Sequence, residues 1–168
     1  MVEIVIYIAG LAVMTLVVTG AIRFIVSDFS STDYAKSAFT FGNIAMERMG
    51  EIVRNQAVSI DFDESAFATS SGQLIFNAST TTGAVIKRQI SKSPAGDLMI
   101  CTPHGCPAED TLLSTTWARV SSLRFDPLIS SSSEGVRVTM TIESVKSDMK
   151  RYYTLYNTIM VRDSYIGK

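Results

Sequence analysis

The first twenty-two positions of the chain are almost entirely apolar. From Ile4 to Ile22 the sequence reads IVIYIAGLAVMTLVVTGAI, nineteen residues with no charge, no proline and no amide. Such a helix, at about 1.5 Å per residue, spans roughly 28 Å, close to the hydrocarbon thickness of a bilayer. Glu3 is the only charged side chain in this region. The pattern predicts an apolar helix with one carboxylate near its start, and a carboxylate at that place needs a partner.

The residues alone leave three interpretations of this segment open. A signal peptide carries a basic region before a shorter apolar stretch and a small-residue cleavage site. This chain has no Lys or Arg before Arg23, and the helical pattern continues beyond it. A single-span membrane anchor fits the length and composition. A helix that first lies in a membrane and later packs into a polymer fits as well, and in that case the Glu3 carboxylate acquires a partner.

Beyond Arg23 the apolar positions recur at helical spacing on one side only. They are separated by three or four residues and comprise Tyr34, Ala38, Phe41, Ala45, Met49, Ile52 and the polar last member Gln56. The opposite side is polar and carries Lys36, Thr40, Asn43, Glu47, Arg48, Glu51, Arg54 and Asn55. This pattern predicts an amphipathic helix that covers a globular core.

No proline interrupts residues 1–57, which favours one rod of roughly 55 residues, about 80 Å long. Two points in it are weak. Gly20 costs about 1 kcal/mol in a helix interior. In the segment FSSTDY at 29–34, Ser31, Thr32 or Asp33 would suit the N-cap of a separate second helix.

The remainder of the chain has the alternation and turn signals of β-strands. Strands are expected at Gln73–Ala78, Ala84–Ser91, Asp97–Cys101, Arg119–Asp126, Val136–Glu143 and Tyr152–Arg162. In the fifth of these, Val136, Val138, Met140 and Ile142 alternate with Arg137, Thr139, Thr141 and Glu143, which indicates one buried and one wet face. In the last, Tyr153, Leu155, Ile159 and Val161 alternate with Tyr152, Thr154, Tyr156 and Thr158. These two strands, joined by a turn at 146–148, predict a long hairpin whose apolar face the amphipathic helix covers.

The expected fold class is therefore α+β. A long N-terminal α-helix, apolar in its first half and amphipathic in its second, packs on an antiparallel β-sheet. Residues 1–28 form the apolar half, 29–57 the amphipathic half, and 58–168 the globular sheet domain. A chain of 168 residues fits one such domain plus its helix.

The net charge and the cysteine content narrow the range of ligands and covalent links that the chain could have. The net charge of −1, with scattered Lys and Arg, provides no basic stripe to attract nucleic acid. Cys101 and Cys106 lie in one short segment, and in an oxidising compartment such a pair predicts a disulfide. Free thiols are one alternative. A zinc site built with His104 and Glu109 or Asp110 is another, although the spacing is not that of a standard finger.

Enzyme signals are weak. The chain contains no phosphate-binding loop, no H-E-x-x-H and no G-x-S-x-G pattern. The carboxylates of Asp61, Asp63 and Glu64 in the segment SIDFDE are interpreted as a solvated strand end, since EF-hand calcium spacing is missing. We expect no enzyme activity, no catalytic residue, no metal and no cofactor.

Taken together, these parts resemble a known family. The segment MVEIVIYIAGLAVMTLVVTGAI is similar to the mature N-terminus of type IV pilins and type II secretion pseudopilins. In that family an apolar helix with an early glutamate carries a globular β domain on its second half. The resemblance covers residues 1–56 in pattern and the sheet domain only in architecture. The chain departs from the family in three respects: the glutamate is third rather than fifth, no basic leader with its glycine precedes it, and the mid-helix proline is missing.

The resemblance implies a structural role in an extracellular filament. Subunits would wait in the inner membrane and then polymerise, after processing by a prepilin peptidase, on a pilus assembly platform. Their partners would be copies of the chain and other pilin-like subunits. Glu3 matches the carboxylate that pairs with a neighbouring subunit's N-terminal amine, here that of Met1. The filament core would be formed by Ile4, Ile6, Tyr7, Ile8, Leu11, Val13, Met14, Leu16 and Val17.

A second function class fits the same residues. The chain would then be a single-span, membrane-anchored binding module on the outer side of the membrane that never polymerises. An anchor gains nothing from a carboxylate at Glu3, whereas a polymer does, so this residue separates the two hypotheses.

Overall fold

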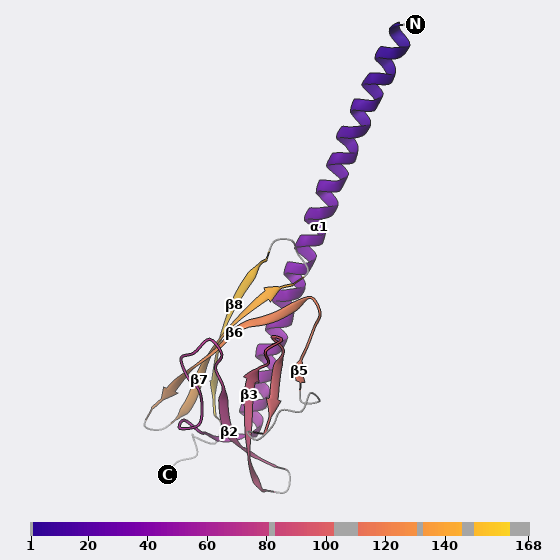
Figure 1. Ribbon diagram of the computed structural model, residues 1–168. Helices are drawn as coiled ribbons and strands as arrows, with labels where there is room; N and C mark the ends of the chain where they lie inside the picture. The colour runs from indigo at the N-terminus through magenta and orange to yellow at the C-terminus, as the bar shows by residue number, and fades with distance from the viewer. Residues whose placement is uncertain (1, 81–82, 103–110, 131–132, 146–149, 162–168) are drawn as a thin grey trace.

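In the computed structural model, the described residues are 2–80, 83–102, 111–130, 133–145 and 150–161, with only the backbone described at residues 30, 31 and 111. One helix, α1, runs from Val2 to Gln56 (Figure 1). It passes through Gly20 and through 29–34 without a break, which excludes the alternative of a second helix. The Thr32 hydroxyl donates back to the carbonyl oxygen of Asp28 at 3.0 Å. It therefore bonds within α1 instead of capping a new helix.

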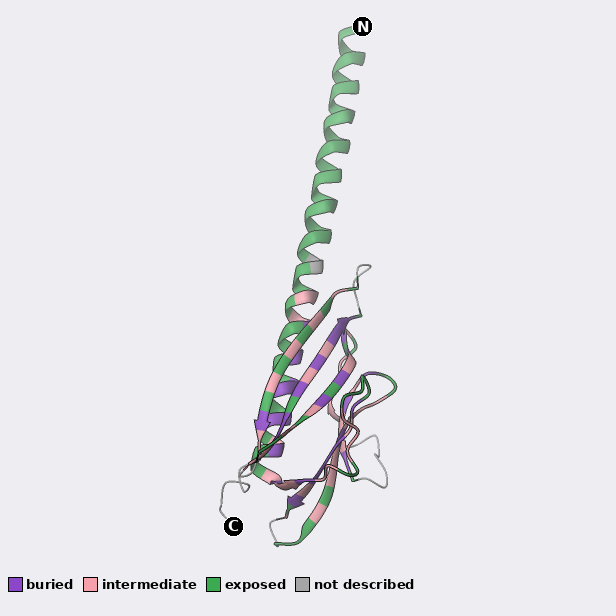
Figure 2. Ribbon diagram, turned by 90° about the vertical axis from the view of Figure 1, so that its left-hand side faces the viewer, coloured by how far each residue is buried: buried purple, intermediate pink, exposed green. Residues whose placement is uncertain are grey.

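The second half of α1 is amphipathic as predicted. The core-facing stripe includes the predicted Ala38, Phe41, Ala45 and Met49, all buried. Its centre also contains Gly42, Met46, Gly50 and Val53, which the sequence interpretation had not included. Every residue assigned to the polar side from Lys36 to Asn55 is exposed. Figure 2 shows the buried stripe on the side that faces the strands.

Eight strands follow the helix in the part of the chain that the structure describes. Six of them match the predicted strands within two residues: β2 (Leu74–Ser79), β3 (Val85–Lys92), β4 (Leu98–Cys101), β6 (Ala118–Ile129, longer by three at its C-terminal end), β7 (Glu134–Ser144) and β8 (Tyr152–Met160). Two were missed, namely β1 (Ala57–Ile60) and β5 (Thr111–Leu113). Both are short, and β1 follows α1 directly with no turn residue between them. Ala57 therefore belongs to β1 rather than to the helix.

The strands form two antiparallel sheets, so the prediction of a single sheet needs correction. The first sheet has the order β1-β2-β3-β4-β5 and the second the order β6-β7-β8. The outer edge of β6 is bonded by loops of the first sheet instead of by a strand. The Gly72 amide donates to the Leu123 carbonyl at 2.7 Å, and the Val120 amide donates to the Gly96 carbonyl at 2.8 Å. Alternation identifies a strand, but it does not specify which strand lies beside it.

The β7–β8 hairpin packs against α1, as predicted. Val136 pairs with Ile159, Met140 with Leu155, and Ile142 with Tyr153. Aromatic side chains join the helix to the globular domain. The ring of Phe39 meets that of Tyr153 edge-on at 6.4 Å, and the ring of Phe41 meets that of Trp117 at 6.1 Å. One hydrophobic cluster includes residues of α1 and of both sheets.

Glu143 was predicted on the wet face of β7, and that prediction is wrong. The residue is only 5 % exposed. Its carboxylate accepts a hydrogen bond from Arg119 Nε at 2.8 Å and forms an ion pair with Lys150 Nζ at 3.2 Å. The Arg119 bond, followed by the Lys150 bond, holds the pKa of Glu143 below its ordinary value despite burial. Two cations make burial of this carboxylate tolerable at the end of the strand.

Candidate functional site: the projecting helix

The first half of α1 lies against no other element. Residues 2–29 are exposed throughout, and the strands lie only along one side of the second half of the helix (Figures 1 and 2). Seventeen large hydrophobic side chains from Val2 to Phe29 are each at least 51 % exposed. Burying such side chains is worth about 1.5–3 kcal/mol each, so leaving this surface in water costs tens of kcal/mol. Lipid or protein must cover it.

The length and composition of α1 are sufficient to cross a membrane. An eighteen-residue window of it has a mean hydropathy of 2.3 and no more than two charged residues, and none of it is buried within the chain. Signal sequences near an N-terminus meet the same criteria. Glu3 and Arg23 are twenty residues apart, about 30 Å along a helix, so the two charges lie near opposite ends of the span.

The residues predicted to form the assembly surface lie on this projecting half. The exposed fractions of the nine predicted core side chains lie between 61 % for Val13 and 78 % for Tyr7. Glu3 is exposed beside them in the first turn of the helix. Met1 lies outside the described residues. The structure brings none of the described members into contact with the globular domain, and their role in assembly stays a prediction.

The exposed apolar surface is larger than the predicted list. It also contains Val2, Val5, Val18, Ile22, Phe24, Ile25, Val26 and Phe29. The same hydropathy that identified the first nine residues would have identified these. Phe29, 70 % exposed, extends the surface one residue past the expected boundary at 28. The projecting half therefore ends where the helix first meets the strands, near Tyr34.

Two hydroxyl groups inside the apolar half are satisfied by the helix itself. Thr15 Oγ1 donates to the carbonyl oxygen of Leu11, and Thr19 Oγ1 donates to that of Thr15, both at 2.7 Å. Such back-bonds remove the cost of placing a threonine hydroxyl in an apolar environment. These two threonines do not oppose burial of the rod.

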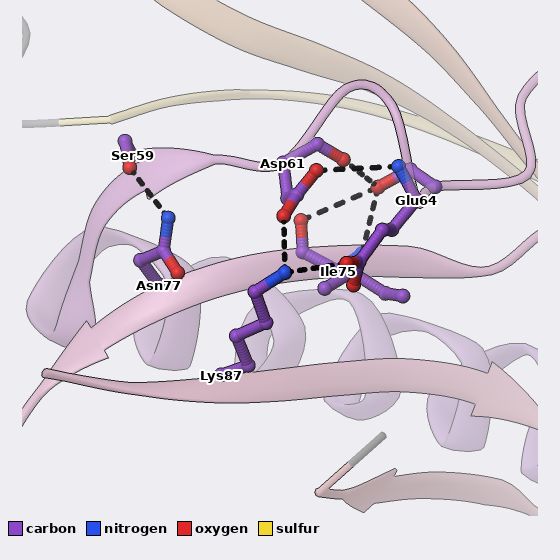
Figure 3. A network of polar contacts seen from close by, with 7 residues as sticks. Ser59, Asp61, Glu64, Ile75, Asn77 and Lys87 are labelled. Atoms are coloured by element: carbon purple, nitrogen blue, oxygen red, sulfur yellow. Dashed lines mark hydrogen bonds and ion pairs between the residues drawn. The ribbon is translucent and has the colours of Figure 1, made fainter. Parts of the chain in front are cut away.

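In the acidic segment after β1, Asp63 and Glu64 are exposed, as the interpretation of a solvated strand end expects, but Asp61 is half-buried and belongs to an ion-pair network that was not predicted. Lys87 Nζ contacts Asp61 Oδ2 at 2.8 Å and Glu64 Oε1 at 2.6 Å, so β3 is tied to the turn that follows β1 (Figure 3). The hydrogen bond from Lys87, supported by the Glu64 amide, lowers the pKa of Asp61, and the two carboxylates raise the pKa of Lys87. The single positive charge of Lys87 is shared by the two carboxylates and offsets one of their two negative charges. Among the described residues no group of three or more His, Cys, Asp or Glu is arranged to hold a metal.

The predicted disulfide falls partly outside the described residues. Cys101, at the end of β4, is disulfide-bonded and 4 % exposed. Cys106, the other cysteine of the chain, lies outside the described residues, as do His104, Glu109 and Asp110 of the zinc alternative. A bonded Cys101 argues against the alternative of free thiols.

A polar groove lies between the exposed side of α1 and β8. Its volume is about 590 Å³, and its walls include Asn43, Glu47, Glu51, Arg54 and Tyr156. No described histidine, cysteine or serine in the walls offers a nucleophile–base pair of the kind that hydrolytic enzymes use.

Comparisons with protein-family models, with curated proteins and with solved structures found no match to this chain. The features that bear on its function are therefore those of the chain itself. A globular domain with a buried hydrophobic core lies at one end, and an uncovered, mostly apolar helix lies at the other.

Proposed function

We propose that this chain is a structural subunit of a type IV pilus-like or pseudopilus filament, held in the inner membrane before assembly. The single observation that carries the proposal is the continuity of α1. One unbroken helix is uncovered and mostly apolar from residue 2 to residue 29, and from Ala38 to Val53 one side of it packs into the core of a globular domain.

Such a helix suits two successive environments. In a single subunit, lipid covers the apolar half, whose uncharged run from Ile4 to Ile22 has the length of a bilayer's hydrocarbon layer. In an assembly, parallel copies of the same half cover one another, and the globular domains remain outside. Exchange of lipid for protein costs little hydrophobic free energy, because both are apolar, so packing and polar pairing decide the outcome.

Glu3 is the polar group that distinguishes assembly from simple anchoring. A carboxylate buried among apolar helices is stable only beside a cation or strong hydrogen-bond donors. The resemblance to pilins implies that a neighbouring subunit's N-terminal amine is this cation. It also implies the other partners: further pilin-like subunits, a prepilin peptidase and an assembly platform, with the mature protein in a filament on the cell surface.

The alternative is a membrane-anchored binding module that does not polymerise. The groove beside β8 favours this function, since its mixed charges would suit a polar ligand. The alternative assigns no task to Glu3, and it leaves the apolar half in lipid permanently. The two functions therefore differ in what happens when Glu3 is changed.

The first test is Glu3→Ala in cells that display the protein. Membrane insertion should be intact or improved, because a charge near the hydrocarbon boundary is removed. Filament number should fall strongly, because the neighbouring cation loses its partner. Asp63→Asn is the control, since it removes an exposed carboxylate of the globular domain and should leave filament number unchanged. Normal filaments in the Glu3→Ala strain would refute the proposal.

The second test locates the apolar half in the intact fibre. Val13→Cys and Ser71→Cys each place one thiol at a position that is exposed in the single chain. A membrane-impermeant maleimide should label Ser71→Cys and not Val13→Cys in sheared fibres. The parent protein controls for reaction of the native cysteines. Equal labelling at both positions would mean that the helix does not form a filament core.

A further inference from the structure

The projecting half contains very few polar side chains that lack a hydrogen-bond partner within the described chain. Between Val2 and Ile22 the side chains that carry an oxygen are those of Glu3, Tyr7, Thr15 and Thr19. Both threonine hydroxyls are used in bonds to α1 itself. Glu3 and Tyr7 have no hydrogen-bond partner among the described residues, and both are exposed. Two unsatisfied polar groups, Glu3 and Tyr7, therefore enter any environment that covers residues 2–22 of the helix.

These two residues are one helical turn apart. Positions i and i+4 are neighbours on a helix surface, about 6 Å between their β-carbons. Helical side chains lean toward the N-terminus, so the ring of Tyr7 covers the turn that begins at Glu3. A phenol that reaches back over that turn brings its hydroxyl to the level of the Glu3 carboxylate, in a rotamer that a helix allows.

The chemistry of the two groups is complementary. An ionised carboxylate only accepts hydrogen bonds and has room for about four. A single cation from a neighbour leaves some of these sites empty, and a buried phenol without an acceptor is costly as well. One bond from phenol to carboxylate removes both costs, and bonds to charged acceptors are stronger than those between neutral groups.

We propose that Tyr7 is a positioning residue of the assembly site, whose hydroxyl donates to a Glu3 carboxylate when the helices pack together. The carboxylate belongs to the same subunit or to the copy beside it. The bond orients the carboxylate toward the incoming cation. This inference rests on the filament function proposed above. It adds a second polar contact to the site, supplied by a side chain one turn away.

The first test compares two variants that each remove one hydroxyl group from the projecting half. Tyr7→Phe keeps the ring and deletes the proposed donor. Thr15→Val is the matched control, because its hydroxyl bonds only to the Leu11 carbonyl. A lost bond to a charged group corresponds to roughly a ten- to hundredfold lower assembly constant per subunit. Tyr7→Phe should show this loss in the ratio of assembled to membrane-held protein, whereas Thr15→Val should stay near the parent value.

The second test observes the bond in wild-type fibres and does not require Tyr7→Phe to assemble. Tyr7 is the second residue of the only Ile–Tyr step of the sequence, so carbonyl-labelled isoleucine with uniformly labelled tyrosine identifies its signals in solid-state NMR, and glutamate is labelled at its carboxyl carbon. A hydrogen bond places Tyr7 Cζ within about 5 Å of the glutamate carboxyl carbon and produces a cross-peak. The contact between the Tyr152 hydroxyl and Glu143 at 3.5 Å provides an internal reference in the globular domain.

The outcomes separate this inference from the function on which it rests. A Tyr7–glutamate cross-peak with a selective loss in Tyr7→Phe supports it. If Glu3→Ala abolishes filaments but Tyr7 shows no cross-peak and Tyr7→Phe behaves like Thr15→Val, the inference fails alone. Tyr7 would then be an aromatic residue of the membrane interface. If Glu3→Ala forms normal filaments, the proposed function fails and the inference with it.

Discussion

Two glycines in the buried stripe of α1 allow the packing of the helix on the hairpin to be tested by a matched pair of substitutions. A β-carbon at Gly42 would lie 2.2 Å from Ile142 Cδ1 and 2.3 Å from Leu155 Cδ1. A β-carbon at Gly50 would lie 3.6 Å from Asn157 Nδ2, an ordinary contact distance. Gly42→Ala and Gly50→Ala make the same chemical change in the same helix, and only the first forces neighbours to move.

The expected effects follow from two opposing contributions. Either substitution gains up to about 1 kcal/mol, because alanine is the better helix former. At Gly42 the new methyl group overpacks the interface with β7 and β8, which costs about 1–3 kcal/mol. The ends of Ile142 and Leu155 can shift, which places the cost toward the lower part of this range. Gly50→Ala should therefore stabilise the protein, and Gly42→Ala should be less stable than Gly50→Ala by about 1–3 kcal/mol.

Thermal unfolding of the full chain in detergent measures the difference. Trp117 is the only tryptophan and meets Phe41 at 6.1 Å, so its fluorescence reports on the interface beside Gly42. For a chain of this size each kcal/mol shifts Tm by about 2–4 °C. Leu155→Ala should weaken the effect of Gly42→Ala, since it removes one of the two atoms in the way. Equal Tm shifts of the same sign in both glycine variants would refute the close approach at Gly42.

Three further predictions concern the globular domain. Deleting residues 1–28 should leave a soluble protein with a cooperative melting transition, because the core begins at Ala38; an insoluble product would show that the boundary is wrong. The Arg119 bond lowers the pKa of Glu143, so its stabilisation is present above the ordinary value of 4.5 and is lost as the pH falls below it. Glu143→Gln should therefore be less stable than the parent at pH 7 and lose less stability below pH 4.5, as measured by urea unfolding; parallel pH profiles would contradict this. Intact mass should show alkylation of Cys101 and Cys106 only after reduction, and two thiols that react without reductant would exclude the disulfide.

The sequence by itself determined the features that depend on neighbours along the chain. The unbroken apolar run and the absence of proline predicted one long helix, and spacing of three and four residues identified its buried side from Ala38 to Met49. Alternation with a period of two identified β7 and β8 as a hairpin and assigned the exposed side of β8 correctly. Each of these features is set by backbone geometry that repeats within a few residues, so it is encoded locally.

Only the tertiary structure decided which strands pair and which elements pack against one another. It placed β1 through β5 in one sheet and β6 through β8 in another, because hydrogen-bonded strand edges look alike in any sequence. It buried Glu143 against the alternation, because Arg119, 24 residues away in the sequence, and Lys150 both pair with its carboxylate. It also brought Gly42 against the β7–β8 hairpin, a contact that the periodicity of the sequence does not predict. Which strands pair and which faces pack together depends on the apolar surfaces that jointly exclude water. That is a property of the whole folded chain rather than of any one segment.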